Sequence, residues 1–245
     1  MMHKNKIGNL ARLILDNATK PRDFRVVNEK ADEATVYVYG VIGGYWGDVD
    51  AQSFASALAA IDAKVIHLRI NSPGGDVFDA RAMMAAIKQH SAKVIGHIDG
   101  MAASAATDIC MACDEIKIVK GGRFMIHNAW TLAIGNKADL RDTADILEGV
   151  DNDIADDYVA RTGRERSEIV GWMDAETWMT AEQAKERGFA DEVVEVVSGT
   201  KNLAEWDLSA YANAPKPEEK PQPDPEAVRA SLERRFRLLA QPAAA

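Results

Sequence analysis

The stretch INSPGGDVFDA at residues 70–80 joins an apolar segment to an amphipathic one. The residues before the turn, VIHLRI (65–70), are rich in β-branched side chains and predict a buried strand, and VFDARAMMAAIKQH (77–90) predicts a helix. The adjacent Gly74 and Gly75 let the backbone turn sharply and approach a ligand closely. Free N–H groups at the start of the helix can bind an anion or a developing oxyanion. Taken alone, the motif is equally typical of a plain strand–helix turn.

The alternation of strand and helix patterns continues on both sides of this turn. Strands are predicted at 35–42, 65–70, 94–98, 116–119, 123–126 and 192–197, and helices at 51–61, 77–90, 102–112, 137–161 and 181–187. Such alternation is typical of an α/β fold made of parallel βαβ units, with helices on both faces of the sheet. Catalytic groups in such folds gather beyond the carboxyl ends of the strands.

Composition limits the class of protein. The chain has 245 residues and a net charge of −9, with 47% hydrophobic residues, which is typical of a soluble protein of one or two domains. The acidic balance argues against an extended nucleic-acid surface. No apolar run approaches the ~18 residues that a membrane span needs, and the N-terminus lacks a signal-peptide pattern. We therefore expect a cytoplasmic protein with neither a nucleic-acid nor a membrane partner.

The two cysteines, Cys110 and Cys113, form a C-x-x-C pair. This spacing occurs in redox and metal sites, but a zinc site needs further ligands, and no second pair or histidine cluster accompanies it. The pair also falls late in an alanine-rich helix pattern, so we interpret both as packing residues and expect no metal.

The prolines divide the chain. Five of the eight lie within 215–225, which predicts an extended linker. We therefore predict an N-terminal segment at 1–28, a globular domain at 29–200, a Pro-rich linker at 201–225 and a basic amphipathic tail at 226–245. The tail is interpreted either as a weakly folded terminal helix or as a docking peptide for a partner.

Two further strand ends carry unusual polar residues. Ser104 lies among alanines in DGMAASAA (99–106), at a predicted helix start, where it could be a nucleophile or a simple helix cap. His127 ends the strand pattern FMIHN (124–128), and histidine is the usual general base because its pKa lies near neutrality. A base of this kind is commonly oriented by a carboxylate. Asp174 and Glu176 are the candidates, although each alone also fits an ordinary surface charge.

Together these motifs are more specific than any one of them. INSPGGDVFDA, GMAASAA, RFMIHN and ETWMTAEQAKERGFAD, in this order and spacing, resemble the Clp-type serine peptidases over about residues 30–197. The greatest similarity is to the phage head maturation (prohead) proteases. The resemblance implies a crotonase/ClpP-like fold with a protruding helical handle at 137–161, a Ser-His-acid triad and ring-shaped homo-oligomers.

The resemblance also implies roles for individual residues. Ser104 would be the nucleophile and His127 the general base. The amides of Gly74 and Ala105 would form the oxyanion hole, and Gly75 would shape the turn.

The identity of the acid stays open at this point. The family's acid is usually an aspartate just before an F-L-S-A-like motif, and ETWMTA (176–181) places Glu176 there. Asp174 lies two residues earlier and could act instead. The scheme requires no metal or organic cofactor.

The predicted function is that of a serine endopeptidase that cleaves scaffold, portal or capsid proteins, in the host cytoplasm or inside the prohead. One alternative is a cellular Clp-type protease subunit that works with an ATP-dependent unfoldase. Another is a signal-peptide-peptidase-like enzyme with a Ser-Lys dyad, for which Lys93, Lys117 and Lys120 are present. Two further alternatives are a crotonase-fold acyl-CoA enzyme and a non-enzymatic capsid component.

Overall fold

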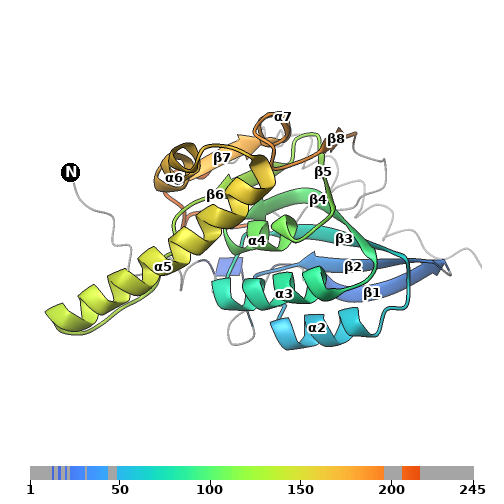
Figure 1. Ribbon diagram of the computed structural model, residues 1–245, viewed down its shortest axis with the longest axis horizontal. Helices are drawn as coiled ribbons and strands as arrows, with labels where there is room; N and C mark the ends of the chain where they lie inside the picture. Colours follow the sequence, from blue (N-terminus) through green and yellow to red (C-terminus); the bar gives the residue numbers. More distant parts are fainter. Residues whose placement is uncertain are drawn as a thin grey trace, which may run out of the picture. The chain divides into compact units, whose positions relative to one another are not determined.

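The computed structural model in Figure 1 describes residues 13, 16–17, 20, 23–30, 32–43, 49–195 and 206–215. The chain forms two compact units, Met1–Ala214 and Pro215–Ala245. All the helices and strands described below belong to the first unit, and the predicted tail at 226–245 lies outside the described residues. The boundary between the units falls inside the predicted linker of 201–225, so residues 206–214 belong to the first unit.

An eight-stranded sheet runs through the described part of this unit. Its strands are β1 (Asp23–Lys30), β2 (Glu33–Tyr39), β3 (Val65–Ser72), β4 (Lys93–Ala103), β5 (Glu115–Val119), β6 (Arg123–Ile126), β7 (Thr177–Thr180) and β8 (Glu192–Val194). The order is β1-β2-β3-β4-β5-β8, and every pair is parallel except β1 with β2. β6 pairs in parallel with the end of β4, and β7 pairs with β6 in the antiparallel sense.

Six helices accompany the described strands: α2 (Ala51–Ala59), α3 (Val77–Gln89), α4 (Ala105–Met111), α5 (Lys137–Thr162), α6 (Arg166–Asp174) and α7 (Ala181–Glu186). In Figure 1, α2, α3 and α4 lie over the same face of the sheet. α3 buries Ala80, Met83, Met84 and Ile87, the apolar spacing of a helix with one face on a core. In the same core β3 buries Ile66, Leu68 and Ile70. No helix in the described ranges is long and apolar enough to cross a membrane.

α5 is the predicted protruding helix. It begins with a capping box at Asn136 and runs for 26 residues, of which only Ile154, Ala155 and Tyr158 are buried. Figure 1 shows its N-terminal half projecting beyond the sheet. The predicted α/β fold with a protruding helix is therefore confirmed.

The predicted helix at 102–112 starts later than expected. Residues 101–103 continue β4, because Met101, Ala102 and Ala103 pair with β6. Sheet pairing here outweighs the helix preference of the alanines. α4 begins only at Ala105, so Ser104 stands at the junction of a strand and a helix.

Three elements did not emerge from the sequence patterns. β1 starts at Asp23, ahead of the boundary expected at residue 29, because it pairs with β2 from Asp23 opposite Tyr39 onward. α6 and β7 fill the stretch between α5 and α7. β7 has only four residues and α6 buries only Ile169 and Met173, so neither gives a long periodic signal.

Candidate active site

Ser104 occupies a strained turn between β4 and α4. Its backbone has φ = 53°, a left-handed conformation that costs a non-glycine residue about 1–3 kcal/mol. The turn is held because the Ser104 N–H donates to the Met125 carbonyl (2.9 Å) and the Ser104 carbonyl accepts from the Thr107 N–H (2.8 Å). This conformation places the hydroxyl at the end of the strand and the start of the helix.

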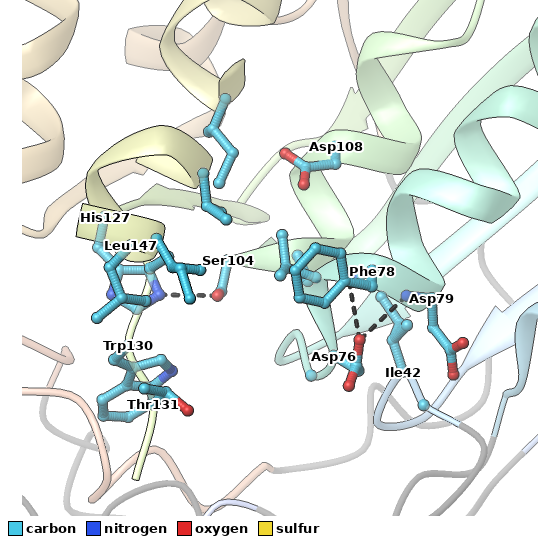
Figure 2. Close-up of a pocket in the computed structure, with 18 of the residues that line it drawn as sticks. Ile42, Asp76, Phe78, Asp79, Ser104, Asp108, His127, Trp130, Thr131 and Leu147 are labelled. Carbon is cyan, nitrogen blue, oxygen red and sulfur yellow. Dashed lines mark hydrogen bonds between the residues drawn. The ribbon is translucent and has the colours of Figure 1, made fainter. Parts of the chain in front are cut away.

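His127 follows β6 directly and reaches this hydroxyl. Its Nε2 lies 2.7 Å from Ser104 Oγ. Figure 2 marks this hydrogen bond by a dashed line. Burial lowers the pKa of His127 to about 4, although the negative charge of Glu176 acts in the opposite direction. The imidazole is therefore neutral at pH 7 and able to accept a proton. The structure thus brings together the two residues that the sequence proposed as nucleophile and base.

The glycine loop after β3 lies against the same serine. A Cβ added to Gly74 would lie only 2.7 Å from the Ser104 Cβ, and Gly74 has φ = 101°. Gly75, at φ = 150°, packs so closely on Ile42 that a Cβ there would overlap the Ile42 backbone. Both positions therefore require glycine, as the sequence predicted for a close backbone approach.

The N–H groups at this point differ in their partners. The Gly74 N–H donates to Ser72 Oγ at 3.2 Å. Ala105 is the first residue of α4, so its N–H has no carbonyl partner within the helix. The two predicted oxyanion donors thus both belong to residues next to Ser104. The Gly74 N–H is already hydrogen-bonded to the Ser72 hydroxyl.

The two candidate acids have different surroundings. Asp174 Oδ1 accepts a hydrogen bond from Asn128 Nδ2 at 2.8 Å. Glu176 Oε1 accepts from Trp178 Nε1 (3.2 Å), and its charge raises the pKa of His127. Neither carboxylate is hydrogen-bonded to His127 among the residues that the structure describes. Glu176 is the carboxylate that acts on the imidazole electrostatically.

Glu176 accepts hydrogen bonds from the segment at 206–214, which was predicted to belong to the linker. The Ala212 N–H donates to Glu176 Oε2 (2.9 Å) and the Asn213 N–H to Oε1 (2.6 Å). Tyr211 donates from its hydroxyl to the Pro73 carbonyl (2.5 Å), next to the glycine loop. This segment therefore links the candidate acid Glu176 to the loop of the predicted oxyanion hole.

Aromatic side chains surround the imidazole. The His127 ring centroid lies 5.5 Å from those of Trp130 and Tyr211, nearly perpendicular to both, and these two rings stack on each other. Sequence reasoning missed Tyr211 and the rest of this segment. The signal in the sequence was the presence of Trp206 and Tyr211, two large aromatic residues that are both buried in the fold, in a stretch otherwise interpreted as a linker.

A cavity of about 590 Å³ opens beside Ser104 and His127. Its walls come from the glycine loop and the start of α3, from residues 129–131 and from α5. Figure 2 shows Phe78 and Leu147 on opposite sides of the Ser104 hydroxyl, and Phe78 is 66% exposed. Ser104 and His127 therefore face a space large enough for a substrate side chain.

The other candidate groups are engaged elsewhere. Cys110 and Cys113 are unpaired and buried, which confirms that they are packing residues, and burial raises the pKa of Cys113 to about 12. His67 Nδ1 and His97 Nε2 lie 3.0 Å apart on neighbouring strands. No cluster of metal-ligating side chains occurs within the described ranges.

The lysines proposed for a Ser-Lys dyad form ion pairs outside the cavity. The pairs are Lys93 with Glu115 (2.9 Å), Lys117 with Glu192 (2.9 Å) and Lys120 with Glu195 (3.1 Å). None of the three lysines lines the cavity beside Ser104. The hydrogen bond between Ser104 and His127 leaves the dyad without support.

Comparison with known proteins identifies the family. The family model described as Clp protease matches residues 25–197. The ATP-dependent Clp protease proteolytic subunit of Bacteroides fragilis is 29% identical over 159 residues, 62% of this chain and 77% of that protein. Proteolytic subunit 1 of Chlamydia abortus is 33% identical over 129 residues, 51% of this chain and 67% of that protein.

A solved structure agrees on the fold. A ClpP1 point mutant from Listeria monocytogenes superimposes with a TM-score of 0.59 at 24% identity, covering 66% of this chain and 91% of that one. The chain has the ClpP-like α/β fold that the motifs implied. It belongs to the Clp protease family and is a serine-type peptidase.

Proposed function

We propose that the chain is an endopeptidase in which Ser104 is the nucleophile and His127 the general base. The observation that carries this proposal is the 2.7 Å hydrogen bond between Oγ and Nε2. The neutral imidazole takes the hydroxyl proton as Ser104 attacks a peptide carbonyl, and then returns it to the leaving amine. Water hydrolyses the acyl-enzyme by the same sequence of steps. The scheme uses no metal and no organic cofactor.

The N–H groups of Gly74 and Ala105 stabilise the tetrahedral oxyanion in this scheme. The Ala105 N–H has no partner within α4. The Gly74 N–H exchanges its 3.2 Å bond to Ser72 Oγ for a bond to the negatively charged oxygen, which is a stronger acceptor. Loss of one such donor lowers the rate by about 10²–10³.

Glu176 is the proposed acid. Its charge favours the imidazolium that forms when His127 takes the proton, and its own position is held by the segment at 206–214. Asp174 is bound to the Asn128 side chain and is not assigned a role in proton transfer.

A fluorophosphonate probe tests this assignment, because it reacts only with an activated serine. We expect the wild type to be labelled at Ser104, and Ser104→Ala to be unlabelled. Ser53→Ala, on the exposed face of α2, is the matched control and should label like the wild type. Absent labelling of the wild type, or equal labelling of Ser104→Ala, contradicts the proposal.

The proposed biological role is phage head maturation, with scaffold, portal or capsid proteins as substrates. Support comes from the likeness of the motifs to the prohead protease branch. We also propose a homo-oligomeric ring, in the host cytoplasm or inside the prohead. Apolar side chains exposed on and near the projecting half of α5 support such association: Leu132, Ile134, Leu140 and Ile146.

Co-expression with the adjacent structural genes tests the role. Active protein should shorten one or more structural proteins, whereas Ser104→Ala should leave them intact. A labelled, active enzyme that cleaves none of them would contradict the phage role.

The similarity to the ATP-dependent Clp protease proteolytic subunits of Bacteroides fragilis and Chlamydia abortus favours a second candidate, an ATP-dependent proteolytic subunit of the cell. Degradation of a folded, tagged protein that requires both ATP and a host unfoldase would support this second candidate. Cleavage of structural proteins without ATP would support the first.

A further inference from the structure

Asp108 is a buried acid that the proposed mechanism does not use. It lies on α4, four residues after Ser104, and both residues line the same cavity. The residue is 1% exposed, and its Oδ2 has no hydrogen-bond partner within the described part of the chain. Native proteins rarely leave a buried carboxylate oxygen unpaired, so this atom requires an explanation.

The carboxylate lies in the same cavity as the reactive serine. Asp108, Ser104 and His127 all line it, and Figure 2 shows the Asp108 carboxylate pointing from α4 into the space above Ser104. The opposite wall is apolar and comes from α5: Ile146, Leu147, Val150 and Ile154. Asp76 and Asp79 also line the cavity, but Asp76 is exposed and Asp79 is half-buried. Asp108 is therefore the one buried acidic group in a cavity whose opposite wall is apolar.

The neighbouring charged and polar groups are already engaged. Arg81 on α3 donates to Asp157 on α5 (3.1 Å) and lies 3.8 Å from Asp153. The Tyr158 hydroxyl, also on α5, lies 2.5 Å from Thr107 Oγ1.

Burial raises the pKa of Asp108 to about 7, against the opposing charge of Arg81. The charge of Asp157 raises it further. An incoming cation would favour the ionised form, and would supply the hydrogen bonds that the protein itself does not provide.

We propose that Asp108 makes this cavity a subsite for a cationic side chain, lysine or arginine, on the substrate residue whose carbonyl Ser104 attacks. The apolar wall of α5 fits the aliphatic stem of such a side chain, and the carboxylate fits its charged end. The inference rests on the proposed endopeptidase function and adds the substrate class to it.

Peptidyl aryl phosphonates, which mimic acylation by phosphonylating the serine, provide the test. Three probes differ only in this side chain: arginine, its neutral isostere citrulline, and leucine. The wild type should react about 10–100-fold faster with the arginine probe than with the citrulline probe, the range expected for a buried charge-assisted hydrogen bond. In Asp108→Asn this advantage should disappear, while the leucine probe should react at the wild-type rate or faster.

Asp62→Asn is the matched control. It removes one carboxylate from an exposed loop outside the cavity and should keep the arginine preference. A wild type that is labelled by fluorophosphonate but prefers leucine overturns the inference alone, and needs no variant to fold. An equal loss with all three probes in Asp108→Asn also overturns it, because that result indicates a structural role. A wild type that no serine probe labels overturns the endopeptidase function, and this inference with it.

Discussion

The two sides of the active site are held in different ways. On the side of the proposed nucleophile and base, Ser104 and His127 follow β4 and β6, and these strands pair directly through residues 101–103 and 123–125. On the side of the proposed acid, Glu176 lies in a turn with φ = 47°, and two of its hydrogen bonds come from residues 36 and 37 positions later. The sheet positions the first side. The second side is positioned by a segment near the C-terminal end of the unit in sequence.

The two sides should therefore respond differently to single substitutions. The Ser104–His127 contact depends on backbone pairing, which a single side-chain change leaves intact. The acid depends on side-chain and loop contacts that single changes remove. Variants on the acid side should therefore alter the catalytic rate without destroying the nucleophile.

Glu176→Gln should have the largest effect on the acid side. Removing the charge removes the stabilisation of the imidazolium, and we expect kcat/KM to fall on the order of 10²–10⁴-fold. Asp174→Asn is the matched control and should change kcat/KM only about two-fold. Peptide hydrolysis by both variants measures this. Equal losses in the two variants would contradict the assignment of Glu176, and a reversed order would make Asp174 the acid.

The same contrast explains which parts of the site the sequence could predict. Ser104, His127 and the glycine loop each end a strand pattern, and parallel strands bring their carboxyl ends to one edge, so local patterns were enough to predict that these residues lie together. The role of residues 206–214 depends on contacts between residues far apart in the chain, such as Tyr211 with Pro73. No periodicity predicts a contact of that kind. Asp108 had a local signal, its spacing from Ser104, but only burial revealed that its oxygen is unpaired in the described part of the chain.

The pH dependence tests the environment of the base. Since burial lowers the pKa of His127 to about 4, the imidazole stays neutral and active well below the usual value of 6.5. The rate should remain high as the pH falls to about 5 and decline only as the pH passes through about 4. The rate should be measured with an uncharged probe such as the fluorophosphonate, because the ionisation of Asp108 then does not change the binding of a charged substrate side chain. Burial also raises the pKa of Tyr211, which therefore stays neutral throughout.

A labelling rate that already declines as the pH falls through about 6.5, rather than through about 4, would contradict this picture of a buried base. Glu176→Gln sharpens the test, because Glu176 raises the pKa of His127. Removal of the Glu176 charge should move the decline of the rate to still lower pH. A variant that merely disturbed the fold would not shift the decline in that direction.

Tyr211→Phe should have the smallest effect and tests whether the segment at 206–214 supports both sides. The change removes the hydroxyl, which donates to the Pro73 carbonyl and also interacts with the Ser104 side chain, but keeps the ring that stacks on Trp130. We expect the free energy of unfolding to fall by about 1 kcal/mol, since a buried acceptor loses its donor. Thermal unfolding measures this, as a shift of about 2–4 °C. Tyr37→Phe, on β2, is the matched control and should be close to neutral. Equal shifts in the two variants would mean that the Tyr211 hydroxyl does not tie the segment to the glycine loop.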